Sequence, residues 1–240
     1  RFYRSTEQVM RLTRMGCSHP TRLSFLRQLL RRLKKENWSF DRPVWQINRQ
    51  GVGRAVYRAQ GPERCYSLLV FAHDLPEEMR SDRVIATAWD ATFTLFDGIP
   101  SAADIKRLER NVPLQEAGRI SAKELSLSRA NRSVRLFEYM VTELAQGRQP
   151  ARSRLEQTGY LMRTTAVYGT GKFGAADRST LVGRPEMQAP FQAEMLSVWL
   201  TRAFTIDLVD HLAAEQGGVQ AVRLDPTLRR LLGVGNSTGL

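Results

Sequence analysis

Three short runs of β-forming residues, separated by two turn-like segments, constrain the fold of this chain more than any other feature. The runs are residues 43–48, 54–59 and 65–71. Residues 49–53 and 61–64 between them are rich in Gly, Pro and charged side chains, as turns are. Strands joined by such short connections pair antiparallel, so the sequence predicts a three-stranded meander. The third run is almost entirely apolar and is expected to lie deepest.

An amphipathic helix is predicted ahead of this sheet, over residues 21–36. Pro20 precedes it, in a position that suits the first helical turn. A solvated basic face explains its composition, and a nucleic-acid-binding helix is an alternative interpretation. Leucines recur at helical spacing on one face (Leu23, Leu26, Leu29, Leu30 and Leu33), and basic side chains cover the rest (Arg27, Arg31, Arg32, Lys34 and Lys35).

Residues 83–96 fit either a strand or a helix. Alternate apolar side chains at Trp89, Ala91, Phe93 and Leu95 are typical of a strand. The length of the segment and its apolar stripe at helical spacing favour a helix that ends at residues 97–98.

Most of the remaining chain is predicted to be helical. Capping-box patterns, in which a Ser is followed three residues later by an acidic residue, open two helices at Ser101 and Ser121. The second of these is expected to run to residue 147. Further helices are predicted over residues 151–167, 191–216 and 228–232, and the segment 191–216 is apolar enough to be the central buried helix.

The predicted fold class is therefore α+β: a small N-terminal helix with a three-stranded antiparallel sheet, followed by a mainly α-helical domain. The two parts are residues 1–98 and 99–240, and the second is expected to continue beyond this segment. No parallel βαβ alternation is predicted, which argues against a nucleotide-binding fold of the Rossmann or P-loop kind.

The composition favours a basic, cytoplasmic protein with an anionic partner. The chain carries 36 Lys and Arg against 24 Asp and Glu, a formal net charge of +12. No apolar run reaches the 18 or so residues of a membrane span, and no signal peptide opens the chain. Because it begins on Arg1 without Met, we expect a piece of a longer protein. Cys17 and Cys65 lack partners at metal-ligand spacing, so the sequence predicts neither a metal site nor a disulfide.

The segment 168–174, YGTGKFG, is a candidate anion-binding loop. Its glycines allow backbone N–H groups to converge on a ligand, and lysine and arginine side chains supply positive charge. The predicted ligand-binding residues are Gly169, Gly171, Lys172, Gly174 and Arg178. A plain bend between two helices is the alternative. The letters also fit GxGxxG, but the dinucleotide fingerprint must follow a strand, and the preceding segment is predicted to be helical.

Two further groups of polar residues could complete such a site. The final loop, GVGNSTG, offers Asn236, Ser237 and Thr238 beside flexible backbone, although Gly233 is also explained as a helix C-cap. Arg132 lies with Arg129 and Arg135 on one predicted helix face, where it could bind a carboxylate or phosphate. A solvated face or salt bridges would equally explain these three arginines.

His73 and His211 are the candidate catalytic residues. His73 follows the third predicted strand beside Asp74, and Asp207 stands one helical turn before His211. Either imidazole could act as a general base near neutral pH, although a structural role is the favoured interpretation for both.

The sequence thus favours an enzyme segment or ligand-binding domain that holds an anionic small molecule at its glycine loops. It indicates no reaction, cofactor or oligomeric state, and its motifs match no characterised family. The alternative is a nucleic-acid-binding module that uses the basic helix 22–35 and the basic strand 54–59. The predicted α-β-β-β-α order over residues 21–96 is similar to that of double-stranded-RNA-binding domains, but Glu77 and Glu78 replace the expected phosphate-binding lysines.

Overall fold

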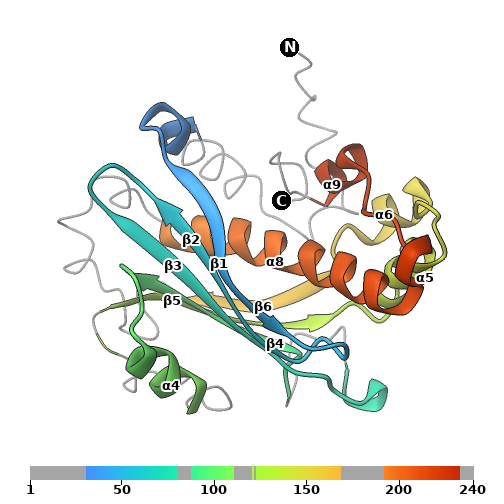
Figure 1. The fold of residues 1–240 in the computed structure, drawn as a ribbon, viewed down its shortest axis with the longest axis horizontal. Coiled ribbons are helices and arrows are strands. Elements are labelled where there is room, and N and C mark those ends of the chain that lie inside the picture. Colours follow the sequence, from blue (N-terminus) through green and yellow to red (C-terminus); the bar gives the residue numbers. More distant parts are fainter. Residues whose placement is uncertain (1–30, 81–87, 111–120, 122, 169–191, 233–240) are drawn as a thin grey trace.

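A single antiparallel sheet of six strands forms the body of the protein, with the strands in the order in which they follow along the chain (Figure 1). The computed structural model describes residues 31–80, 88–110, 121, 123–168 and 192–232. The strands are β1 (Ser39–Ile47), β2 (Gly53–Gln60), β3 (Cys65–Ala72), β4 (Ala91–Asp97), β5 (Glu124–Arg132) and β6 (Met162–Tyr168).

Helices cover both faces of this sheet. The long helix α8 lies across one face, α4 lies on the opposite face, and α5 and α6 stand at one end (Figure 1). Residues 31–35 are also helical, within the helix predicted ahead of the sheet. The helices are α4 (Ala102–Arg110), α5 (Phe137–Ala145), α6 (Arg152–Thr158), α8 (Gln192–Gly217) and α9 (Pro226–Leu231), with single 3-10 turns η1 (Glu77–Met79) and η3 (Gly218–Gln220).

The main core lies between the sheet and α8. Side chains at alternate strand positions point toward the helix, among them Leu68 and Val70 of β3. Phe204 of α8 is fully buried at the centre of this core. The centre of its ring lies 6.4 Å from that of Tyr57 on β2 and 5.7 Å from that of Phe93 on β4, both edge-on.

A smaller core fills the opposite face of the sheet. Leu69, Phe71 and Phe96 pack there against Leu108 of α4. Strand β3 is therefore buried on both faces, which confirms the prediction that it lies deepest.

The predicted fold class is wrong, although its first half is correct. The three predicted strands form, and they pair antiparallel as expected. The sheet, however, continues through β4, β5 and β6 across residue 98, so the second half of the chain is not a mainly helical domain. The described part of segment 83–96 contains strand β4 rather than a helix. Thr92 and Thr94 alternate with Phe93 and Leu95 as in a strand, but all residues from Ala91 to Phe96 are buried, and the apolar residues at helical spacing favoured the wrong interpretation.

The two capping-box patterns have different outcomes. At Ser101 the prediction is confirmed, because α4 follows the pattern. The Asp104 N–H donates to the Ser101 hydroxyl (3.1 Å), and the Asp104 carboxylate accepts from the Ser101 N–H (3.0 Å). At Ser121 the backbone N–H likewise donates to the Glu124 carboxylate, but Glu124 begins strand β5. The same hydrogen bond closes a turn in both places, and it does not determine the conformation of the residues that follow.

The predicted helix over residues 151–167 is also wrong in its second half. Helix α6 ends at Gly159, which has φ +74° and donates its N–H to the Leu155 carbonyl (2.7 Å). This left-handed C-cap allows the chain to turn into β6. The long helix predicted over residues 191–216 is confirmed as α8, and α9 covers most of the final predicted helix. Within the described residues, no helix is both long and apolar enough to cross a membrane.

If α8 is packed on the sheet as described, Phe204→Ala should lower the free energy of unfolding by about 3–5 kcal/mol, because it leaves a cavity among three rings. Gln216→Ala on the exposed side of the same helix is the matched control, with an expected change within about 0.5 kcal/mol. Urea denaturation measures both variants. A loss below about 1 kcal/mol for Phe204→Ala would contradict the position of α8.

Candidate functional site

The ends of three neighbouring strands bring several polar residues together. Because Ala72 pairs with Ala91 and Ala91 with Ala130, the residues just beyond these pairs are also neighbours. The His73 N–H donates to the Asp90 carbonyl (2.7 Å), and the Asp90 N–H donates to the Asn131 side-chain oxygen (2.8 Å). Antiparallel register thus assembles residues that are up to 58 positions apart in the sequence.

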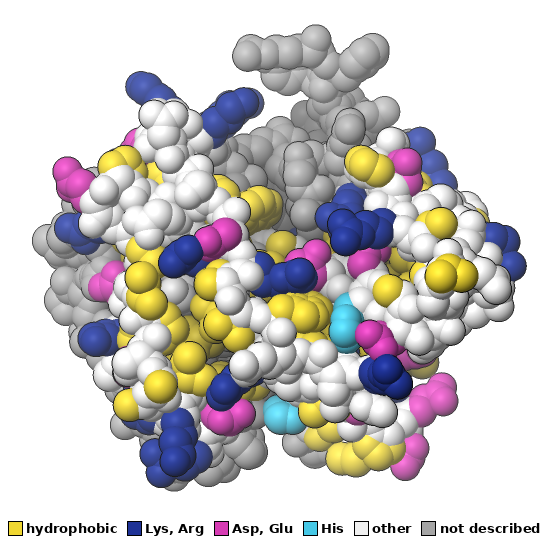
Figure 2. Space-filling view, in the orientation of Figure 1, with side chains coloured by type: hydrophobic (Ala, Val, Ile, Leu, Met, Phe, Trp, Pro, Cys, Tyr) yellow, Lys and Arg dark blue, Asp and Glu magenta, His cyan; other side chains and the backbone are white. Residues whose placement is uncertain are grey.

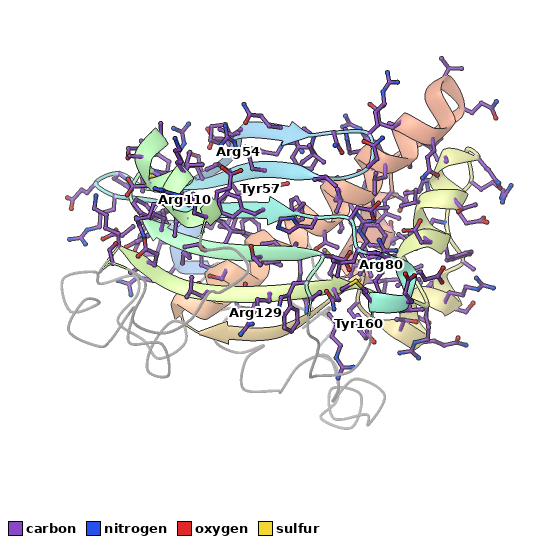
Figure 3. All side chains as sticks on the ribbon, turned by 90° about the horizontal axis from the view of Figure 1, so that it is seen from below. Arg54, Tyr57, Arg80, Arg110, Arg129 and Tyr160 are labelled. Atoms are coloured by element: carbon purple, nitrogen blue, oxygen red, sulfur yellow. The ribbon has the colours of Figure 1, made fainter. Side chains whose placement is uncertain are left out.

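Five charged side chains gather at this end of the sheet, and we refer to Asp74, Arg80, Asp90, Arg132 and Glu138 as the charged cluster. Figure 3 shows Arg80 at this end, beside the helices α5 and α6 and away from Arg110 on α4. Asp90 is the centre of the cluster and is fully buried. Its carboxylate accepts hydrogen bonds from the Arg132 backbone N–H (2.8 Å) and from Arg80 Nε (3.2 Å).

Arg132 is the most buried cation of the cluster, with only 5% of its side chain exposed. Its Nη1 donates to Asp74 Oδ1 (3.3 Å) and lies 3.8 Å from Glu138 Oε1. The guanidinium carbon stands 4.8 Å from the centre of the Phe137 ring. Its Nε and Nη2 have no hydrogen-bond partner among the described residues, and Asp90 Oδ1, the nearest carboxylate oxygen to Nε, is 3.9 Å away.

The two unpaired nitrogens form one edge of the guanidinium. The N–H groups of Nε and Nη2 point in the same direction, so this edge is a two-donor fork that matches the two oxygens of a carboxylate or phosphate. Burial is the main influence on Arg132 and lowers its pKa, while Asp90 opposes this shift. An arginine remains charged even so. A buried charge with unmet donors is costly, and the fork is therefore suited to accept an anion or water.

The turn between β1 and β2 covers the fork. We call residues 48–52 the Gly51 turn. Gly51 has φ +79°, and a Cβ atom there would lie 2.8 Å from Arg132 Nη2. The same atom would approach Leu208 and Leu212 of α8 at 3.4 and 3.3 Å. Only glycine combines this backbone conformation with so close an approach to the guanidinium.

Arg132 was predicted from the sequence, but its setting differs from the prediction. It is the last residue of strand β5, not part of a helix face. The guanidinium of Arg129 stands 4.9 Å from the Trp89 ring, and Arg135 Nη2 donates to the Tyr160 hydroxyl (3.2 Å). The three arginines therefore do not form one binding face, because the helix that would align them is absent: Arg129 and Arg132 belong to β5 and Arg135 lies beyond its end.

The two candidate histidines lie on different elements and have different partners. His73 lies beside the charged cluster, its Nε2 is buried without a hydrogen-bond partner among the described residues, and burial lowers its pKa from the ordinary value of 6.5. His211 on α8 contacts the Gly51 turn, where its Nε2 lies 2.9 Å from the Asn48 carbonyl oxygen. Asp207 does not orient His211. It accepts hydrogen bonds from the Tyr57 hydroxyl (2.6 Å) and Arg42 Nη1 (2.9 Å) instead.

The two predicted glycine loops lie outside the described residues, so the placement of their members stays a prediction. These members are Gly169, Gly171, Lys172, Gly174 and Arg178 in the first loop and Asn236, Ser237 and Thr238 in the second. One premise is corrected: the first loop follows strand β6, which ends at Tyr168, rather than a helix. The described strands are nevertheless all antiparallel, so GxGxxG does not follow the strand of a parallel βαβ unit there.

Sequence reasoning missed Asp74, Arg80, Asp90 and Gly51 as members of a site. Asp74 and Asp90 are the carboxylates that flank the apolar strands β3 and β4, and this signal was hidden for Asp90 once its segment was assigned to a helix. The described residues include no group of three or more His, Cys, Asp or Glu that could hold a metal ion. The chain matches no known family model, no curated protein and no solved structure.

The half-buried imidazole of His73 predicts a pH dependence of stability. Because its folded pKa lies below its unfolded value of 6.5, the unfolded chain takes up a proton first as the pH falls. The stabilisation is complete above pH 6.5 and is lost as the pH drops below it. Between about pH 7.5 and about pH 5, the wild type should lose more unfolding free energy than His73→Gln, as measured by urea denaturation. Parallel pH profiles of the two proteins would show that His73 is not buried.

Proposed function

We propose that this chain binds a small molecule bearing a carboxylate or phosphate group, and that Arg132 anchors that group. The observation that carries the proposal is the buried Nε–Nη2 edge of Arg132, which has no hydrogen-bond partner among the described residues. Arg132 also belongs to the set of anion-binding residues predicted from the sequence. The proposed ligand is thus of the class expected from the sequence, with its charged group at the end of the sheet.

The charges around the fork are compatible with an anion. Asp90 is the carboxylate nearest to the free edge, and Arg80 together with the Arg132 backbone N–H already offsets its charge. Asp74 and Glu138 lie on the Nη1 side and are about half exposed, so water screens their repulsion. Two hydrogen bonds from a guanidinium to an oxyanion contribute about 1.5–3 kcal/mol each. We expect this gain to exceed the repulsion.

The nucleic-acid alternative has less support. Both arginines of the basic strand face carboxylates: Arg58 forms an ion pair with Asp41, and Arg54 lies 3.8 Å from Glu109. Lys and Arg side chains are interspersed with Asp and Glu over the face in Figure 2, without a continuous basic patch. Because residues 91–97 form a strand, the α-β-β-β-α order that favoured an RNA-binding domain is not retained. Most of the basic helix 22–35 lies outside the described residues, and its role stays a prediction.

The proposal is tested with inorganic phosphate and succinate as probes, through the rise in Tm of the chain and by calorimetry. Arg132→Lys retains the charge but loses the fork, and should weaken binding of the effective probe about 10–100-fold. The exposed Arg148→Lys is the matched control and should bind as the wild type does. Glu138→Gln removes a carboxylate near Nη1 and should tighten binding a few-fold. If neither probe binds the wild type, or if Arg132→Lys binds as tightly as the control, the proposal is wrong.

A further inference from the structure

We propose that the Gly51 turn is a gate, and that an anion reaches the Arg132 fork only when residues 48–52 lift away from α8. This inference rests on the proposed function, since it concerns access to the same fork.

The two sides of the Arg132 guanidinium differ in their access to solvent. The Nη1 side leads to Asp74 and Glu138, whose side chains are 47% and 58% exposed. The Nη2 side abuts Gly51, so closely that even a Cβ on that residue would lie 2.8 Å from the nitrogen. A ligand atom that bonds to Nη2 needs at least the space of a methyl group. An oxygen at the position of that Cβ would overlap Gly51, so the turn has to move aside before an anion reaches Nη2 from this direction.

The Gly51 turn is held together internally and can move as one unit. The Asn48 side-chain oxygen accepts from the N–H groups of Gln50 (3.0 Å) and Val52 (2.9 Å). The Asn48 carbonyl accepts from the Gly51 N–H (3.0 Å), and the Asn48 N–H donates to the Val52 carbonyl (2.9 Å). These bonds all lie within the turn, so lifting it breaks none of them.

Two polar contacts hold the Gly51 turn against α8. His211 Nε2 lies 2.9 Å from the Asn48 carbonyl oxygen, and Arg49 Nε lies 3.1 Å from Glu215 Oε2. The Arg49 side chain is 85% exposed, and exposed ion pairs of this kind are weak. Apolar contact beneath the turn is small, because Gly51 presents no side chain to Leu208 and Leu212. A bound anion can therefore offset the loss of these contacts.

The base of the Gly51 turn, where β1 and β2 begin to pair, contains the pivot. The last pair of the β1–β2 ladder joins Ile47 to Gly53. Gly53 has φ +140°, a conformation available almost only to glycine, and the carbonyl oxygen of Gln46 lies where its Cβ would be. Gly53 also pairs with Ala72 of β3, so the turn moves about a base that stays fixed in the sheet.

The gate is tested by locking it and by loosening it, again with inorganic phosphate and succinate as probes. Arg49→Cys combined with Glu215→Cys places two thiols across this contact, and counting free thiols with and without reductant shows whether oxidation joins the turn to α8. The oxidised protein should lose binding of the effective probe at least 10-fold, and reduction should restore it. Arg49→Ala combined with His211→Ala removes both contacts and should bind that probe more tightly than the wild type, because the open state is more populated. This second variant decides the question if the disulfide does not form.

The outcomes separate the gate from the proposed function. If locked and loosened variants both bind the probe as the wild type does, while Arg132→Lys has lost binding, the gate is wrong and the anion site stands. If the wild type binds neither phosphate nor succinate, the anion site itself is wrong and the gate with it. Weaker binding in the locked form, or tighter binding in the loosened form, supports the gate.

Discussion

A guanidinium buried at the end of a sheet, with two of its three nitrogens lacking a hydrogen-bond partner among the described residues, is the interaction on which this structure depends. Arg132 is the last residue of strand β5. The carboxylate of its neighbour Asp90 accepts one hydrogen bond from the backbone of β5 and one from Arg80, which follows η1. Through these contacts three strand ends and the 3-10 turn are fixed to one another. Buried ion networks contribute little to stability unless their hydrogen bonds are complete. The incomplete edge of Arg132 is therefore better explained by binding than by folding.

The long helix α8 determines how deeply this guanidinium is buried. Its apolar side packs on the sheet around Phe204, and its last turns support the Gly51 turn. Asp207 fixes the rotation of the helix by accepting from Tyr57 on β2 and Arg42 on β1. Burial raises the pKa of Tyr57, and Asp207 adds to the shift, so the phenol remains a hydrogen-bond donor. Movement of α8 would therefore change both the cover of Arg132 and the contacts of the turn.

Local sequence signals predicted the parts of the fold that depend on local interactions. The first three strands followed from their turns, and α8 from its length and apolar character. Strand β4 was not recognised, although Thr92 and Thr94 alternate with Phe93 and Leu95, because its apolar residues also fit a helical stripe. Strand β5 was not recognised because it carries buried serines and follows a capping-box pattern. Ser126, for example, forms a hydrogen bond with Ser197 of α8.

The site was harder to predict than the fold, for a related reason. Arg132 was identified by its type and charge, but its importance comes from burial, which only the assembled sheet creates. Strand register brings Asp90 next to Arg132. Gly51 approaches Arg132 through a turn that lies 81 positions earlier in the sequence. Neither contact leaves a periodic signal along the chain. Long-range register of this kind follows from the complete sheet and not from any one segment.

The central claim is that the Nε–Nη2 edge of Arg132 holds an oxyanion, and its most direct test is crystallographic. Selenium in selenate scatters anomalously and mimics sulfate or phosphate, so crystals grown with it reveal bound anions without ambiguity. The account predicts an anomalous peak within hydrogen-bond reach of both Arg132 nitrogens, with the Gly51 turn displaced. Peaks confined to exposed arginines, together with an Asp90 carboxylate paired to the Arg132 fork, would contradict it.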